Sequence, residues 1–214
     1  GIKTQVGFMF RFGEAVERLR DLIQSDEAGP VALISARYFC NALHADWWRD
    51  RSRSGGQLFE QVIHMFDLLR FLAGDPASVY SRQENLFHQD VPGYTVEDVS
   101  ATVVSFKSKA LGVVYATNNA IPGKWINDYR VVARHLTADF ADANHATFHF
   151  TAGAEQPPMV IASDRDFRLC VIEDWVRAIR TGGETRTPIR EGAKSLDLVW
   201  AAVQSNNRRG EIEL

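Results

Sequence analysis

The chain has 214 residues, of which 45% are hydrophobic and 24% are charged, so it can bury one sizeable core like an ordinary globular domain. Lysine and arginine number 24 against 27 aspartate and glutamate, and the net charge of -3 is spread without a basic run, which argues against a nucleic-acid partner. No stretch approaches the about 20 consecutive apolar residues of a membrane span, and the N-terminus lacks a signal-peptide pattern. We therefore expect a cytoplasmic protein.

The first half of the chain alternates strand and helix patterns. The apolar run Thr4–Phe10 predicts a strand, and apolar residues at helical spacing predict a helix over residues 13–24. The β-rich residues 31–39 predict a second strand, and the polar, aromatic residues 41–53 have no clear period and predict a loop. Residues 54–74 then predict a long helix, which ends at a glycine.

The second half of the chain is mostly strand. Strands are predicted over residues 78–86, 99–106, 111–118 and 129–140, with a hairpin link at 107–110. Two helices are predicted over residues 166–180 and 191–208, followed by an edge strand at 211–214. This order predicts an α+β fold with a largely antiparallel, open sheet and helices packed on one face.

The two cysteines favour a reducing compartment. Cys40 follows an apolar strand pattern and Cys170 lies within a helical one, so we expect buried free thiols. A disulfide between them is the alternative. The chain also begins directly on an apolar run without an initiating methionine, which we interpret as a fragment of a longer protein.

The helix predicted over residues 54–74 carries the most informative residues of the chain. Most of its side chains are apolar, but one polar stripe contains Gln57, Glu60, Gln61 and His64, and we expect this stripe to face a cleft. Ser54 precedes the helix and is a plausible N-terminal cap.

Glu60 and His64 are four residues apart, so their side chains can form a hydrogen bond on a regular helix. Such a bond would fix the imidazole tautomer and make His64 a general acid or base. The alternative is a half-buried histidine that Glu60 satisfies without any chemistry. Asp67 and Arg70 lie farther round the helix, and we expect them to form a structural ion pair at the rim.

The sequence offers no cofactor or metal motif of its own. It contains no G-x-G-x-x-G and no phosphate-binding loop, so any dinucleotide must be held largely elsewhere. His145 and His149 lie four apart, and in a strand they would be about 13 Å from each other by strand rise, which is too far for one ion. We therefore predict surface or strand histidines there and no metal.

The helix over residues 54–74 resembles the signature helix of the glucose-fructose oxidoreductase and inositol dehydrogenase (Gfo/Idh/MocA) family. That signature has a glycine pair, an acidic residue, a histidine four later and then an aspartate, which here fall on Gly55, Gly56, Glu60, His64 and Asp67. The resemblance covers essentially the whole chain, including WWRD before the glycine pair and the C-terminal AAVQSNNRRGEIEL.

The resemblance implies a two-domain protein of which residues 1–214 are the C-terminal substrate and oligomerisation domain. In this family an N-terminal Rossmann domain binds NAD or NADP, and residues 1–12 are similar to its last strand and exit. The family's catalytic lysine lies in that domain and has no counterpart here. Glu60 stands where aspartate is commoner, and its extra methylene moves the carboxylate by about one bond length.

The function that the resemblance implies is oxidation of a sugar or polyol. His64 would remove the hydroxyl proton while hydride leaves for the nicotinamide, and Glu60 would orient the imidazole or the substrate. Arg11, Trp48 and Arg49 are candidate substrate or cofactor contacts, although each could equally be a surface charge or a packed aromatic. A homo-oligomer, a dimer or a tetramer, is expected to form through the sheet.

Two other functions fit the same residues. The domain could be an oligomerisation and ligand-binding module without turnover, in which Glu60 and His64 are inherited structural residues. Alternatively, it could belong to an NAD-dependent enzyme that cleaves a glycosidic bond through transient oxidation, as some relatives do.

Overall fold

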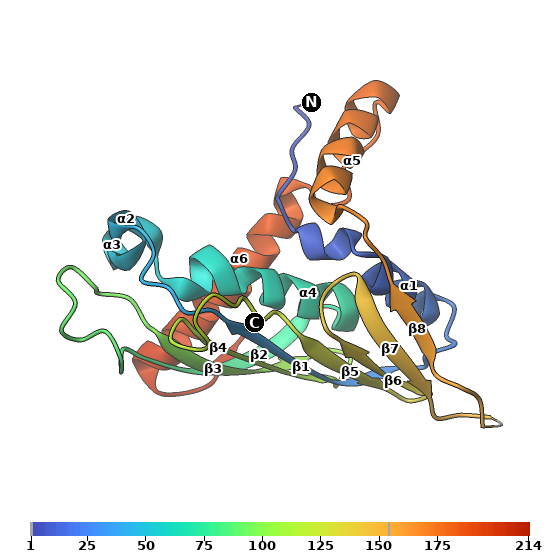
Figure 1. The fold of residues 1–214 in the computed structure, drawn as a ribbon, viewed down its shortest axis with the longest axis horizontal. Coiled ribbons are helices and arrows are strands. Elements are labelled where there is room, and N and C mark those ends of the chain that lie inside the picture. The colour runs from blue at the N-terminus through green and yellow to red at the C-terminus, as the bar shows by residue number, and fades with distance from the viewer. Residues whose placement is uncertain (1, 154) are drawn as a thin grey trace.

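The computed structural model describes residues 2–153 and 155–214, which form one open sheet with helices on one face (Figure 1). The strand order in the sheet is β8-β7-β6-β5-β1-β4-β3-β2-β9. The strands are β1 (Val31–Phe39), β2 (Pro76–Glu84), β3 (Val99–Phe106), β4 (Leu111–Thr117), β5 (Tyr129–Ala133), β6 (Leu136–Phe140), β7 (His145–Phe150), β8 (Met159–Ala162) and β9 (Ile212–Glu213). The helical elements are η1 (Met9–Phe12), α1 (Glu14–Gln24), α2 (Asp46–Arg49), α3 (Arg51–Ser54), η2 (Leu58–Val62), α4 (Ile63–Ala73), α5 (Phe167–Thr181) and α6 (Ile189–Arg208).

The predicted α+β class and largely antiparallel sheet are confirmed. Central strand β1 pairs in parallel with β4, whereas the other ladders between described strands are antiparallel. The expected helices at both ends of the chain, the β3–β4 hairpin and the C-terminal edge strand are all present. Within the described residues, no helix is both long and apolar enough to cross a membrane.

The strand predicted over Thr4–Phe10 is wrong. Residues 4–8 have no regular secondary structure and belong to no sheet, and Val6 donates its amide to the Thr187 carbonyl at 2.7 Å. The chain then turns into the 3-10 helix η1, where Phe10 and Phe12 are buried. The apolar run therefore reflects burial beneath helices and not the pleat of a strand.

Two further segments differ from their predictions. The single strand predicted over residues 129–140 is a hairpin, because the amides of Arg134 and His135 leave the sheet and donate to the carbonyls of Pro30 and Ala28. The loop predicted over residues 41–53 contains the one-turn helices α2 and α3. The segment 129–140 carries no glycine or asparagine that would have signalled its turn.

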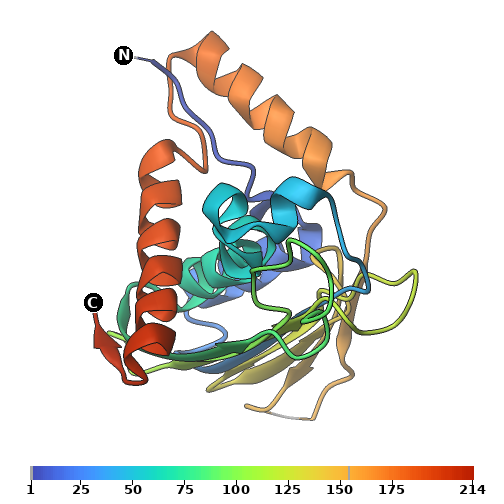
Figure 2. The ribbon, with the colours of Figure 1, turned by 90° about the vertical axis from the view of Figure 1, so that its left-hand side faces the viewer.

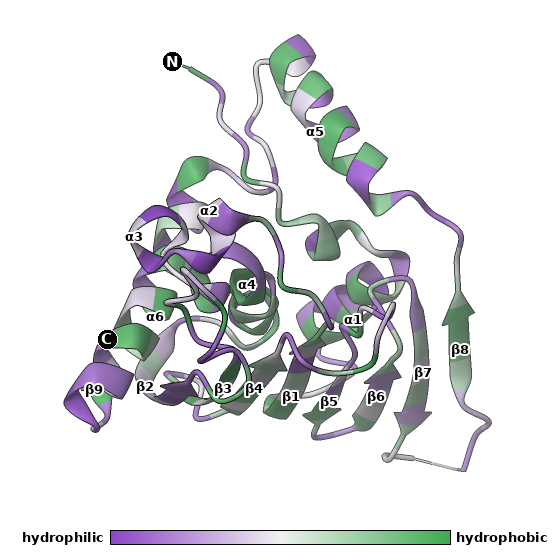
Figure 3. Cartoon of the chain, turned by 60° about the vertical axis from the view of Figure 1, so that its left-hand side comes forward, coloured by the Kyte–Doolittle hydropathy of each residue, from purple (hydrophilic) through white to green (hydrophobic). Residues whose placement is uncertain are grey.

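The sheet has one covered and one open face, as Figures 2 and 3 show. On β1, Ile34 and Ala36 are fully buried beneath the helices, whereas Leu33, which points the other way, is 40% exposed. On β4, Leu111 and Tyr115 also lie on the open face and are partly exposed. The open face therefore presents apolar side chains to solvent.

Helix α5 projects away from the sheet beside the N-terminal segment (Figure 1). Lys3 Nζ donates to the carbonyl of Gly182, just beyond the end of this helix, at 2.6 Å. The exposed apolar residues of α5 are Leu169, Ile172, Trp175, Val176 and Ile179. Cys170 also lies on α5 and is only half-buried, so its predicted burial is wrong. Cys40 is buried as predicted, and both thiols are free.

Candidate active site

The segment that carries Glu60 and His64 begins at a sharp turn formed by Gly55 and Gly56. Both glycines have positive φ, 82° and 112°, a conformation that is costly for other residues. A Cβ on Gly56 would lie 2.5 Å from Glu97 Oε2. The Leu58 amide donates to Glu97 Oε1 at 2.8 Å, so the helix start is capped by a distant carboxylate. The predicted Ser54 cap is wrong, because Ser54 ends the preceding helix α3.

We expect Gly56→Ala to destabilise the chain by about 2–4 kcal/mol, because it combines positive-φ strain with a clash against buried Glu97. Gly93→Ala is the matched control, since Gly93 also has positive φ but has open space where a Cβ would lie. Urea unfolding of both variants measures the difference. Equal losses at the two positions would contradict the proposed close approach of Gly56 and Glu97.

The segment is not a regular α-helix at Glu60. Leu58–Val62 is a π-helical turn, a wider turn that changes the direction in which the following side chains point. Within residues 2–153 and 155–214, no hydrogen bond or ion pair joins Glu60 to His64. The predicted Glu60–His64 hydrogen bond is therefore wrong, because it assumed regular i to i+4 geometry. Single π-turns of this kind are frequent at functional sites.

Glu60 is held by Trp48. The indole Nε1 donates to Glu60 Oε2 at 2.6 Å, and Trp48 is only 2% exposed. Burial raises the pKa of Glu60, while the bond from Trp48 opposes that rise. Trp48 is thus a packed aromatic that positions a carboxylate, and Glu60 Oε1 makes no hydrogen bond with a described residue.

His64 lies in an apolar setting that keeps its imidazole neutral. Its ring contacts Phe8 and Phe10 edge to face, with centroids 6.1 Å and 5.7 Å away. Burial lowers the pKa of His64 to about 4. Nδ1 is buried without a partner, whereas Nε2 is neither hydrogen-bonded to a described residue nor buried. Nε2 is therefore the nitrogen that can meet a substrate.

The buried imidazole makes the stability of the chain sensitive to acid. An unfolded chain protonates His64 near its ordinary pKa of about 6.5, whereas the folded chain does so only near about 4. The free energy of unfolding should therefore fall by about 3 kcal/mol in total as the pH drops from 6.5 to 4, and remain at its full value above that window. Comparing urea unfolding of the unmodified chain and His64→Gln at pH 7.0 and 4.5 isolates the contribution of His64 to the free energy of unfolding. Identical pH dependence in the two proteins would contradict it.

Arg11 belongs to a buried ionic network and not to the surface around His64. Its guanidinium donates to both carboxylate oxygens of Asp67, at 2.7 Å and 2.6 Å, and Arg11 is 5% exposed. Ser195 Oγ donates to Asp67 at 2.9 Å and accepts from Arg70 at 2.7 Å. The expected substrate contact of Arg11 is not supported by this geometry. The Asp67–Arg70 rim pair is also wrong, because Asp67 pairs with Arg11 in the interior.

Arg49 holds a loop together. Its guanidinium donates to the carbonyls of Leu43 and His44, at 2.9 Å and 2.8 Å, and also pairs with the exposed Asp46. Arg49 therefore stabilises the loop that precedes α2.

The polar stripe predicted on the helix does not face outward as a unit. Gln57 is fully buried and neither atom of its amide has a partner, and Gln61 is buried with an unpartnered Oε1. Buried polar groups without partners are uncommon and require an explanation. Here they accompany the buried Nδ1 of His64 on a single π-to-α segment, which marks this segment as the candidate active site.

Two contributors to this site are missed by the sequence analysis. Glu97 reaches the helix start from 39 residues away in the sequence, and the His44 ring packs on Trp48 at an interplanar angle of 42°, with centroids 4.2 Å apart. His44 has a left-handed backbone with φ of 58°, which is unusual for a residue other than glycine. Neither has a local sequence signal, because each reaches the site through the tertiary fold.

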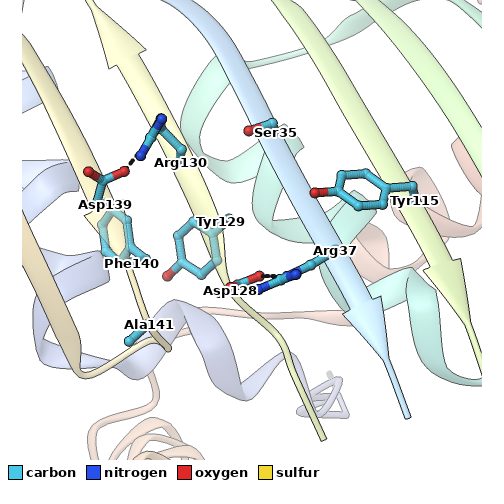
Figure 4. Close-up of a pocket in the computed structure, with 9 residues that line it drawn as sticks. All are labelled: Ser35, Arg37, Tyr115, Asp128, Tyr129, Arg130, Asp139, Phe140 and Ala141. Atoms are coloured by element: carbon cyan, nitrogen blue, oxygen red, sulfur yellow. Dashed lines mark hydrogen bonds and ion pairs between the residues drawn. The ribbon is translucent and has the colours of Figure 1, made fainter. Parts of the chain in front are cut away.

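A cavity of about 590 Å³ lies on the opposite, open face of the sheet (Figure 4). Arg37 pairs there with Asp128, and Arg130 with Asp139, so the cavity is polar and separate from His64. No group of three histidine, cysteine or acidic side chains that could hold a metal occurs in the described part of the chain. His145 and His149 lie on β7, as predicted for strand histidines.

The fold is similar to that of several solved oxidoreductases. A levoglucosan dehydrogenase in complex with NADH and levoglucosan is 17% identical, with a TM-score of 0.89 over 100% of this chain and 66% of that one. An aldose-aldose oxidoreductase from Caulobacter crescentus, in complex with glycerol, is 19% identical, with a TM-score of 0.85 over 99% of this chain and 64% of that one. This chain thus spans slightly less than two thirds of the length of these relatives.

Sequence comparison identifies the family. The Bacillus subtilis (strain 168) protein described as "Uncharacterized oxidoreductase YrbE" is 25% identical over 125 residues, which are 58% of this chain and 36% of the relative. A family model described as "GFO/IDH/MocA C-terminal domain" matches residues 16–153. The chain therefore belongs to the GFO/IDH/MocA family of oxidoreductases, of which it represents the C-terminal domain.

Proposed function

We propose that the chain is the substrate-binding domain of a cytoplasmic, NAD(P)-dependent oxidoreductase that acts on a hydroxyl group of a sugar or polyol. The observation that carries this proposal is His64, a neutral imidazole with one open nitrogen and otherwise apolar surroundings. A base of this kind is needed when an alcohol is oxidised, because the hydroxyl proton must leave as the carbon loses hydride.

In the proposed mechanism, His64 Nε2 accepts the hydroxyl proton and returns it in the reverse direction. The carboxylate of Glu60 shares the site, with Oε2 committed to Trp48 and Oε1 left for a substrate hydroxyl. Of the two roles expected for Glu60, orienting the substrate is the one that this geometry favours, because no bond links Glu60 to the imidazole. Trp48 is then a positioning residue for Glu60.

Three helix N-termini in the described residues are closed to the phosphates of a dinucleotide. Anions bind at open helix N-termini, but here the first amides of three helices are already engaged. Glu14 donates to Asn144, Leu58 to Glu97, and Leu169 to Asp166. We therefore assign NAD or NADP to a domain outside this chain, where it would supply the hydride acceptor.

Two exposed apolar surfaces are consistent with a larger assembly. The apolar side of α5 lies beside the N-terminal segment, and we propose that a nucleotide-binding domain covers it in the full-length protein. The open face of the sheet, with Leu33 and Leu111 exposed, is proposed to pair with a second copy in a dimer or tetramer.

The test is an assay of the full-length protein against a panel of sugars and polyols with NAD and with NADP. We expect substrate-dependent reduction of at least one cofactor, measured by absorbance of the reduced nicotinamide. Binding of a sugar without reduction of either cofactor would favour the oligomerisation and binding module instead.

A further inference from the structure

We propose that Trp125 and His44 form a wall that receives the apolar face of a cyclic sugar, so that the site favours a ring-closed sugar over its acyclic polyol. This inference rests on the proposed function and deepens it by naming the substrate class. It is carried by two loops that the fold brings together on the same side of the sheet as Glu60.

The two loops are fixed to each other by backbone and side-chain hydrogen bonds. One loop follows β1 and contains His44, and the other joins β4 to β5 and contains Trp125. The Ala120 amide donates to the Cys40 carbonyl at 2.9 Å, and Asn41 Nδ2 donates to the Ala120 carbonyl at 3.0 Å. Ile126 also donates to Phe39 at 2.8 Å. Trp125 is therefore carried by an anchored segment.

Trp125 presents a large aromatic surface. Its side chain is 54% exposed, although its ring contacts Tyr38 at 6.1 Å and His44 at 5.7 Å between centroids. Both contacts are edge-to-face, with interplanar angles of 90° and 67°, so no ring is stacked in parallel over the indole. An exposed tryptophan held this way costs little conformational entropy when a ligand packs on it.

An unbroken series of ring and side-chain contacts connects Trp125 to the candidate catalytic groups. His44 lies between Trp125 and Trp48, and the indole of Trp48 donates to Glu60. His44 Nε2 also lies 3.3 Å from Gln61 Nε2, on the residue next to Glu60. Two rings, His44 and Trp48, therefore connect Trp125 to Glu60, and in the proposed complex a sugar packed on Trp125 extends along them toward the carboxylate.

The chemistry of this wall suits a pyranose. A ring-closed sugar has a flat face of C–H groups that packs on an indole, and its hydroxyls point to the sides, where polar groups can receive them. His44 Nε2 faces Gln61 and Cys40, which leaves Nδ1 for such a hydroxyl. An acyclic polyol has no fixed flat face and loses more conformational freedom on binding.

The test uses the full-length protein, a pyranose substrate from the panel and the alditol with the same carbon skeleton. For Trp125→Ala we expect an increase of about tenfold in KM for the pyranose with little change in kcat. The ratio of kcat/KM between pyranose and alditol should fall toward one. Trp47→Ala is the matched control, because Trp47 is a similarly exposed tryptophan on neighbouring α2 without a ring contact to His44. In Trp47→Ala, the KM for the pyranose and the ratio of kcat/KM between pyranose and alditol should stay unchanged.

Equilibrium binding separates this inference from the proposed function. Titration of the same pyranose, followed by intrinsic tryptophan fluorescence, should show binding to the unmodified protein and about tenfold weaker binding to Trp125→Ala. If Trp125→Ala weakens pyranose binding but no protein reduces a cofactor, the proposed sugar-binding role of Trp125 is supported and the oxidoreductase proposal fails. An unchanged KM, an unchanged affinity or an unchanged pyranose-to-alditol ratio of kcat/KM in Trp125→Ala would contradict the proposed role of Trp125.

Discussion

Replacing His64 by alanine in the full-length protein should lower turnover by about a hundredfold or more, with the fold intact. The reason is geometric: Nε2 is the open nitrogen of a neutral imidazole, and the surrounding Phe8 and Phe10 offer no other group to receive a proton. Steady-state rates with the best substrate and cofactor measure the effect, and circular dichroism checks the fold.

A matched histidine and a matched carboxylate sharpen this experiment. His149→Ala changes a partly exposed histidine on β7, and its turnover should stay near that of the unmodified protein. Glu60→Gln keeps an acceptor for the Trp48 indole but removes the charge, so it should raise KM more than it lowers kcat. Turnover of His64→Ala within twofold of the unmodified protein would make the histidine structural.

The second large effect is expected at the buried network around Asp67. Asp67→Asn leaves the Arg11 guanidinium buried without its bidentate partner, so the free energy of unfolding should fall by about 3–5 kcal/mol. Glu191 lies 3.3 Å from Arg11 and compensates part of the charge, which favours the lower end of this range. Urea unfolding of the chain at pH 7 gives the value.

The control for this prediction is an exposed ion pair of the same type. Arg130 and Asp139 pair on the open face of the sheet, where their side chains are 60% and 39% exposed. Asp139→Asn should cost less than about 1 kcal/mol, because solvent screens exposed pairs. A loss of the same size at both aspartates would show that burial does not determine the effect.

The strands were predictable because their periodicity is local. The β-rich composition of residues 31–39 and the alternation in residues 99–106 predicted β1 and β3, since each strand buries one side against the helices and leaves the other open. The strand predicted over Thr4–Phe10 does not form, because its phenylalanines are buried under helices without any strand partner. Apolar composition alone does not separate these two cases.

The candidate site was predictable in its residue types but not in its contacts. Glu60 and His64 stand out by spacing, yet Glu60 lies in a π-helical turn, and the segment begins where Gly56 packs against Glu97, far away in the sequence. Arg11 followed an apparent domain exit, but its partner Asp67 lies 56 residues away. Long-range contacts of this kind decide which polar residues face a substrate and which are buried in pairs.

The most direct test of the central claim is a crystal structure of the full-length protein with nicotinamide cofactor and a bound sugar or polyol. The account predicts His64 Nε2 within about 2.6–3.2 Å of the hydroxyl oxygen on the carbon that faces the nicotinamide. A substrate bound elsewhere, or a reacting hydroxyl beyond the reach of His64 both directly and through one water, would contradict it.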